Sequence, residues 1–398
     1  MTLRKLIFWI HLIAGIAAGL VIIIMSFTGV LLAYEKQIVR WTDRNLLGAA
    51  PPVDAARVPL QAIMERVAES SSGTTPTTLT FYSGHRAVAA AAGASTIYVD
   101  SYSGEKLGMG SAGVRNFFRS AANWHRYLAM SGDSRPTGKS ITSVANLLFL
   151  LTIVVGLFLW IPQGKWNLRS IRNVTWFRRN LGPKARNFNW HSVFGIWAFV
   201  PLFFIALSGT VISFPWASNL VYRLAGTPPP NQNRNRQADG GQEGRNQSAR
   251  PAADLADIDP LLAFAERQVS NWKTIRLQIP TSDKGPVSFT IDRGYGGDPT
   301  LRSTLAMDRS TGEALSSEKF EEQDAGRRAR SWFRFVHTGE YYGRVGQAIA
   351  AVASFAACMM VWTGFVLSWR RLTSWLTNRK PRLMAPELKS SVGGTDAA

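Results

Sequence analysis

Four of the five histidines in this chain stand at the edges of long apolar stretches. His11 and His191 lie near the start of two such stretches, and His125 and His337 lie shortly before two others. A polar ring in an apolar setting costs free energy unless a partner satisfies it. Neutral imidazole is a favoured axial ligand of haem iron, and two rings at equal depth are what a six-coordinate haem needs. A single histidine at a membrane edge is also typical of a plain interfacial residue.

Glycines recur in phase with two of these histidines, in the repeated pattern H-x3-G-x13-G. The residues concerned are His11, Gly15 and Gly29 in the first stretch and His191, Gly195 and Gly209 in the third. Eighteen residues make five full helical turns, so each histidine shares one helix face with its two glycines. A flat macrocycle packs edge-on only where side chains are missing. The second glycine of each set lies about 27 Å beyond the histidine, at the level expected for His125 and His337. The pattern therefore predicts two haems stacked along one face.

Four apolar stretches must position these residues. They cover 6–33, 141–161, 188–214 and 345–369, and about 20 apolar residues suffice to cross a bilayer. The first is too long for a signal peptide, and no A-x-A cleavage site follows it. The fold class predicted is an α-helical membrane protein with four transmembrane helices and two large soluble insertions.

The charge distribution predicts the orientation in the membrane. The formal net charge is +19, but the N-terminus, the link 162–187 and the C-terminal tail together carry 15 basic and only 2 acidic residues. By the positive-inside rule these three segments are cytoplasmic and both insertions lie outside. No folded basic domain remains for nucleic acid. The one cysteine, Cys358, sits in the fourth stretch, so no disulfide and no C-x-x-C-H attachment of haem is expected.

The chain reads as one unit used twice. The first and third stretches align at an offset of 180 residues, and the insertions repeat D-x-x-[S/T]-G-E-x-L from Asp100 and from Asp308. The second and fourth stretches end in GLFLW and GFVLSW. Repeated units of like orientation predict pseudo-two-fold packing about an axis along the membrane normal.

Each insertion predicts a small α+β module. A short helix (58–69; 259–270) precedes alternating apolar segments that are typical of strands. Asp100 and Asp308 are expected to cap the following Ser-Gly or Thr-Gly turn rather than to bind metal. The segment 226–253 is polar and rich in Pro, Gly, Asn and Gln, so we predict disorder there. His85, in a turn of the first module, is expected at the surface.

Four arginines near the outer histidines are candidates for contacts with haem propionates or an anionic substrate. Ordinary membrane-edge arginines would be placed in the same way. The four are Arg119, Arg126, Arg334 and Arg344.

Together, these motifs resemble the PepSY-associated transmembrane family. The resemblance rests on W-I-H-L-I-A-G at the start, W-H-R-Y before the second stretch, H-T-G before the fourth and the double D-x-x-[S/T]-G-E, and it covers about residues 3–372. It implies a bacterial inner-membrane protein with periplasmic PepSY modules. In the ferric-siderophore reductases of the family it implies two non-covalent b-type haems, which move electrons outward to a ferric complex. The matching ligands here would be His11, His191, His125 and His337.

The predicted organisation follows the duplication. It comprises a first span (1–34), a first PepSY-like module (35–115), an outer helix with the second span (116–161), a basic cytoplasmic link (162–187), a third span (188–216), a second PepSY-like module (217–325), an outer helix with the fourth span (326–371) and a cytoplasmic tail (372–398).

Three functions remain open from the sequence. The leading one is a haem-dependent reductase of a ferric siderophore or other ferric chelate, with membrane lipid around it and no nucleic acid as partner. Its electrons would come from quinol or a separate cytoplasmic reductase, since no GxGxxG-like segment follows the fourth span. The second is a non-catalytic membrane anchor whose modules bind a periplasmic partner or protease. The third, a transporter of iron or chelate, is disfavoured because the spans lack acidic residues.

Overall fold

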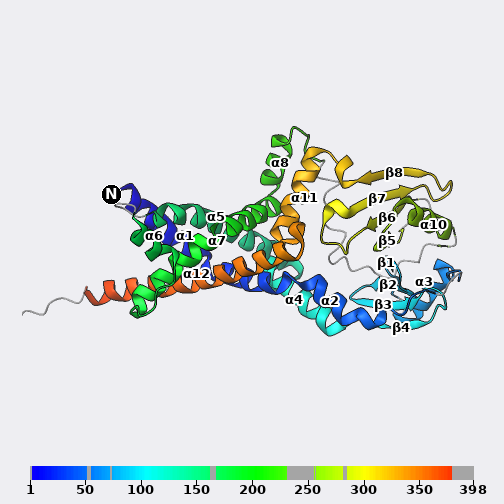
Figure 1. Ribbon diagram of the computed structural model, residues 1–398, viewed down its shortest axis with the longest axis horizontal. Helices are drawn as coiled ribbons and strands as arrows, with labels where there is room; N and C mark the ends of the chain where they lie inside the picture. Colours follow the sequence, from blue (N-terminus) through cyan, green and yellow to red (C-terminus); the bar gives the residue numbers. More distant parts are fainter. Residues whose placement is uncertain are drawn as a thin grey trace, which may run out of the picture.

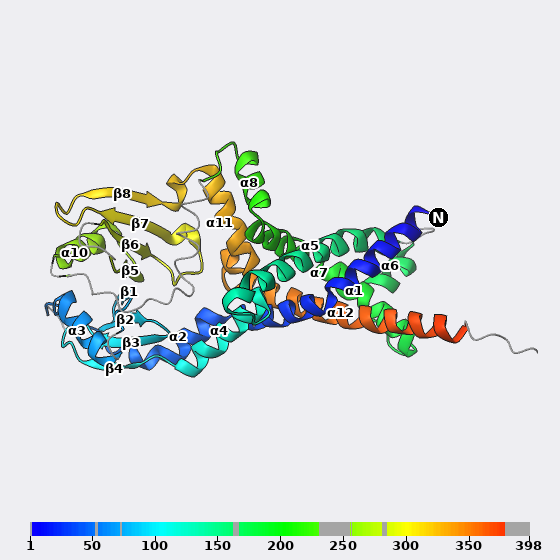
Figure 2. The same ribbon diagram turned by 180° about the vertical axis from the view of Figure 1, so that it is seen from behind.

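The computed structural model describes residues 2–51, 55–71, 74–161, 167–230, 255, 257–280 and 285–378. A bundle of long helices forms one end of the molecule and a large β-sheet the other, with short helices between them (Figure 1). Figure 2 shows the same arrangement from behind.

Four helices make the bundle. They are α1 (Leu3–Leu32), α5 (Arg135–Trp160), α7 (Pro183–Ser213) and α12 (Gly343–Asn378). Each forms or belongs to a helical segment long and apolar enough to cross a membrane, so the four predicted spans are confirmed. Both α1 and α7 pack against α5 and α12, which places α1 and α7 diagonally across the bundle. Buried alanines on α7 and α12, among them Ala206 and Ala357, allow these helices to approach closely.

Short helices connect the bundle to the sheet or lie at its ends. They are α2 (Glu35–Asp43), η1 (Arg44–Leu46), α4 (Ala112–Tyr127), η2 (Gly132–Ser134), α6 (Leu168–Thr175), α8 (Pro215–Leu224), η3 (Pro299–Leu301), η4 (Phe320–Glu322), α11 (Ala325–His337) and η5 (Glu340–Tyr342). Two of them matter most for the site, because α4 packs on α1 and α5 while α11 packs on α7 and α8.

The sheet has eight antiparallel strands in the order β4-β3-β2-β1-β5-β6-β7-β8. Their bounds are β1 (Thr78–Tyr82), β2 (Ala87–Ala92), β3 (Ser95–Asp100), β4 (Lys106–Met109), β5 (Thr274–Gln278), β6 (Val287–Asp292), β7 (Arg302–Met307) and β8 (Ala314–Lys319). In the centre β1 pairs with β5, with Leu79 opposite Leu277. The two insertions therefore share one continuous sheet. The sequence does not predict this pairing between the two insertions.

Two helices pack on the sheet and complete its hydrophobic core. These are α3 (Leu60–Ser70) and α10 (Asp259–Gln268), and their apolar side chains join alternating strand residues such as Leu79 and Phe289 in one buried cluster. Period-two alternation in the strands makes this possible, because every second side chain points to the same face.

The predicted turns are confirmed. The carboxylate of Asp100 accepts hydrogen bonds from the backbone N–H groups two and three residues later, and Asp308 does the same. Gly104 and Gly312 then adopt φ of 73° and 71°, a region that glycine enters without steric cost. Both aspartates thus cap hairpin turns.

Two other predictions have different outcomes. Most of the segment predicted to be disordered, 226–253, lies outside the described residues. His85 is half-buried rather than exposed, and its Nδ1 is buried without a hydrogen-bond partner among the described residues.

Candidate functional site

One pair of histidines faces across the bundle. His11 lies in the third turn of α1 and His191 in the third turn of α7. Because these helices are diagonal neighbours, their side chains meet at the bundle centre. The ring centres are 6.2 Å apart and the ring planes are nearly perpendicular, at 89°. We call His11 and His191 the inner pair.

A second pair lies at the sheet end of the bundle. His125 is in the last turn of α4 and His337 is the last residue of α11. Their ring centres are also 6.2 Å apart, at an interplanar angle of 68°. We call them the outer pair. Each pair combines one histidine from each half of the chain.

Every one of these four rings is held through Nδ1 by a backbone carbonyl of a neighbouring helix. The acceptors are Thr152 O for His11 (3.1 Å), Met360 O for His191 (3.1 Å), Met25 O for His125 (2.9 Å) and Ile205 O for His337 (3.0 Å). A carbonyl oxygen only accepts, so Nδ1 carries the proton and the lone pair is left on Nε2. This is the arrangement in which histidines bind metal, with the second nitrogen fixed by a carbonyl.

Hydroxyl groups support three of the four rings as well. The oxygens of Thr28, Ser208 and Thr363 lie 3.0–3.1 Å from Nδ1 of His125, His337 and His191, in that order. Each hydroxyl donates to a carbonyl of its own helix, so its oxygen is free to accept from Nδ1–H. Thr152 differs in that its backbone carbonyl contacts Nδ1 of His11, while its hydroxyl bonds to Phe149 O.

The separation of the ring centres in both pairs matches that expected for one iron ion between two imidazoles. Imidazole nitrogen binds a metal at about 2.0 Å, so two rings that share one ion from opposite sides have centres about 6 Å apart. The measured separation is 6.2 Å in both pairs. Zinc fits less well, because it takes three or four protein ligands and the described residues contain no cluster of three His, Cys, Asp or Glu side chains.

The predicted glycines occupy different surroundings. A Cβ at Gly15 would meet no atom within 4 Å, and one at Gly195 would meet only Met360 Cε at 3.7 Å. Open space therefore adjoins the inner pair. A Cβ at Gly29 would lie 3.6 Å from His125 Cε1, whereas Gly209 faces the Asn146 amide, not a histidine.

Two further glycines belong to the inner pair, and the sequence reasoning missed them. A Cβ at Gly156 would lie 3.1 Å from His11 Cε1, and one at Gly364 would lie 3.6 Å from His191 Cε1. Both glycines make room for an imidazole ring. They are the glycines of the repeated endings GLFLW and GFVLSW, so the signal was present in the sequence.

Of the four candidate arginines, the structure brings one to the outer pair. Arg126 is close enough to interact electrostatically with both rings of that pair. Arg119 instead donates to Asn116 and to Ala94 O. Of the remaining two, Arg334 lies near the Phe335 ring and Arg344 is exposed at the start of α12.

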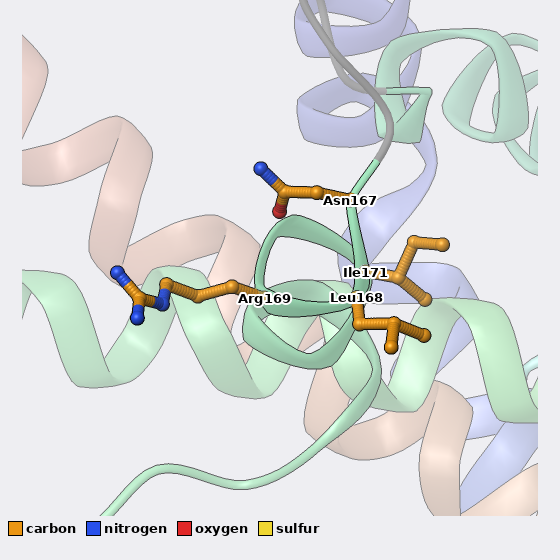
Figure 3. Close-up of a pocket in the computed structure, with 4 residues that line it drawn as sticks. All are labelled: Asn167, Leu168, Arg169 and Ile171. Carbon is orange, nitrogen blue, oxygen red and sulfur yellow. The ribbon is translucent and has the colours of Figure 1, made fainter.

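A hollow of about 660 Å³ lies on α6. Asn167, Leu168, Arg169 and Ile171 line it, and Arg169 and Ile171 extend from opposite sides of the helix (Figure 3). This hollow contains none of the histidines.

Four apolar helices with a large extramembrane sheet define a multi-pass membrane protein. The chain belongs to the PepSY-associated TM region family, whose model matches residues 8–371. The family expected from the motifs is thereby confirmed. No curated protein sequence matches the chain.

Proposed function

We propose that this protein is a di-haem b-type membrane reductase, which passes electrons across the membrane to a ferric chelate on the sheet side. The observation that carries the proposal is the geometry shared by both histidine pairs. In each, ring centres 6.2 Å apart combine with Nδ1 groups tied to carbonyls, so that Nε2 is left to bind iron.

The two pairs stand at two levels of the bundle. His125 bonds to Met25 O on α1, 14 residues beyond His11, which corresponds to about 21 Å along a helix. Haem held at each level would supply one-electron transfer between the two ends of the bundle. The protein's part is to fix four neutral imidazoles, leave open space at Gly15 and Gly195, and exclude water with the apolar core.

The proposed function also specifies the orientation of the protein in the membrane, its electron donor and its electron acceptor. The positive-inside rule places the termini in the cytoplasm and the sheet in the periplasm of a bacterial inner membrane. A ferric siderophore or similar chelate is the proposed acceptor, because oxygen ligands hold Fe(III) much more tightly than Fe(II) and one electron then releases the metal. Quinol or a separate cytoplasmic reductase is the proposed donor.

We also infer that the two halves arose by internal duplication. Equivalent groups serve equivalent histidines: Thr28 and Ser208 differ by the same 180 residues as Met25 and Ile205. The β1–β5 ladder then joins the two modules about a pseudo-two-fold axis. Duplication accounts for two sites with one ligand from each half.

Absorption spectroscopy of the purified full chain tests the function. We expect two low-spin b-type haems per chain, with bands that sharpen on dithionite reduction. His11→Ala and His337→Ala should each retain about one haem, because each removes a ligand from only one pair. His85→Ala is the matched control and should retain two.

Two results would contradict the proposal. A colourless protein from haem-replete cells would favour the non-catalytic anchor, in which the sheet binds a periplasmic partner. Loss of haem from His85→Ala equal to that from His11→Ala would show that the ligand assignment is wrong. A ferric-chelate reduction assay with the reduced protein then tests the acceptor.

A further inference from the structure

Helix α8 turns away from the bundle where its counterpart α2 runs on. After α1, Ala33 keeps a helical backbone and α2 continues toward the sheet. After α7, Phe214 adopts φ −112° and ψ 123°, because the ring of Pro215 disfavours the helical region for the residue before it. As a result α8 runs across the long axis of the bundle, at its sheet end (Figure 1).

One face of α8 is apolar and uncovered. Trp216, Leu220 and Leu224 follow at intervals of four residues and are 56%, 47% and 79% exposed. Residues four apart lie on one helix face. On the helical wheel Arg223 borders this stripe next to Trp216, and Asn219 lies further round on the same side. Exposing this apolar stripe to water would cost free energy, because its side chains would gain nothing from burial.

The opposite face of α8 packs on α11. Tyr222 is buried against Gly326 so closely that a methyl group on that glycine would overlap the tyrosine ring. Arg330 Nε donates to Ser218 Oγ at 3.2 Å. The helix is therefore fixed to the element that carries His337, with its apolar stripe turned outward.

We propose that α8 is a membrane-surface helix, whose stripe of Trp216, Leu220 and Leu224 inserts into the lipid interface at the sheet end of the bundle. A helix with one apolar and one polar face lies in the interface plane, and tryptophan is enriched there. Arg223 reaches the headgroup phosphates from the edge of the stripe. Since α8 holds α11, the lipid surface sets the depth of the helix that ends at His337.

Continuity of the apolar surface favours lipid over a second copy of the chain as the occupant. The exposed side chains of the α7 span, including Val200, Phe204 and Ile212, face lipid in a membrane. Ile212 is four residues before Trp216, across the bend at Phe214, and the Phe214 and Trp216 rings are 5.9 Å apart. The stripe thus extends the lipid-facing surface of α7 around the bend.

Spin-label accessibility in lipid nanodiscs tests the proposal on the full chain. A label is placed at Leu220→Cys in a Cys358→Ser background, and its collision rates with oxygen, which prefers lipid, and with a water-soluble nickel chelate are compared. The references are Val200→Cys in the α7 span and Leu315→Cys on β8, whose native side chains are each 58% exposed. Asn219→Cys, one residue away but turned by about 100°, is the matched control.

The expected result is an oxygen-to-nickel ratio at Leu220 several-fold above that at Asn219 and Leu315, close to that at Val200. A ratio equal to that at Leu315 would place the stripe in water and overturn the proposal. Protection from both reagents, with a dipolar coupling between labels, would assign the stripe to a second copy and overturn it as well. If Leu220→Cys does not fold, Leu224→Cys carries the label, since its side chain is the most exposed of the three.

Discussion

At the scale of single residues, backbone carbonyls orient all four imidazoles. The carbonyls belong to Met25, Thr152, Ile205 and Met360. A side-chain substitution leaves the backbone carbonyl of that residue in place. These four positions should therefore tolerate substitution as long as the helix keeps its position. The sensitive positions are instead the glycines against the rings and the hydroxyls that share Nδ1–H.

Gly156→Ala should disturb the inner pair, and Gly364→Ala should disturb it much less. The new Cβ would lie 3.1 Å from His11 Cε1 in the first case but at an ordinary contact of 3.6 Å from His191 Cε1 in the second. The measurement is the low-spin ferric signal, by electron paramagnetic resonance, of the haem proposed at the inner pair. An equal effect of both variants would contradict the stated role of Gly156.

Ser208→Ala should raise the reduction potential of the haem proposed at the outer pair by roughly 20–65 mV. The Ser208 oxygen accepts from Nδ1–H of His337, and this donation favours the ferric state by increasing the electron density on the ring. A neutral hydrogen bond contributes about 0.5–1.5 kcal/mol, and about 59 mV corresponds to a tenfold change in a one-electron equilibrium.

Potentiometric titration of the two sites measures this shift. Thr152→Ala is the control, because the Thr152 hydroxyl bonds to Phe149 O and only its backbone carbonyl meets His11. The potential of the inner site should then change little. An unchanged potential at the outer pair in Ser208→Ala would show that the Ser208 hydroxyl does not influence it.

At the scale of elements, an ion pair fixes α4, which carries His125, to α2 and the sheet. Asp43 is 2% exposed and pairs with Arg115 of α4. It also accepts from Tyr98 Oη at 2.9 Å and from the Ser111 backbone N–H at 3.0 Å. Burial, helped by Tyr82 and Asp43, raises the pKa of Tyr98, so its hydroxyl stays protonated as a donor.

Asp43→Asn should lower the midpoint of thermal unfolding in detergent by roughly 5–10 °C. Removing one partner leaves the Arg115 charge largely buried without compensation, which costs about 3 kcal/mol or more. Arg66→Ala, which breaks an exposed pair with Glu69, is the control and should shift the midpoint by less than about 2 °C. Equal shifts of the unfolding midpoint in the two variants would show that the Asp43–Arg115 pair does not stabilise the attachment of α4.

At the scale of the whole molecule, the bundle and the sheet are each made from both halves of the chain. The diagonal placement of α1 and α7 brings one histidine from each half to the inner pair, while the β1–β5 ladder joins the halves at the other end. The sheet end must then lie on one side of the membrane as a single body.

Thiol labelling should place the sheet outside the inner membrane and α6 inside. In a Cys358→Ser background, Leu315→Cys on β8 should react with a maleimide that does not cross the inner membrane, because positive residues near α6 retain that end in the cytoplasm. Leu168→Cys, 88% exposed on α6, should react only after that membrane is permeabilised. The reverse pattern would invert the proposed orientation.

The sequence by itself determined the features that depend on neighbours along the chain. Unbroken apolar runs specify the four long helices, because a bilayer demands about 20 apolar residues in each. Asp100 and Asp308 with their glycines specify the hairpin turns through hydrogen bonds over two or three residues. The depth of each histidine along its helix follows from the same local spacing.

Only the tertiary structure decided which groups meet. His11 bonds to a carbonyl 141 residues away and faces a ring on the diagonal helix. Gly156 and Gly364 matter because of a ring from another helix, and β1 pairs with β5 across the two insertions. Such contacts depend on how helices and strands pack. A periodic pattern within one helix or strand does not specify which other helix or strand packs against it.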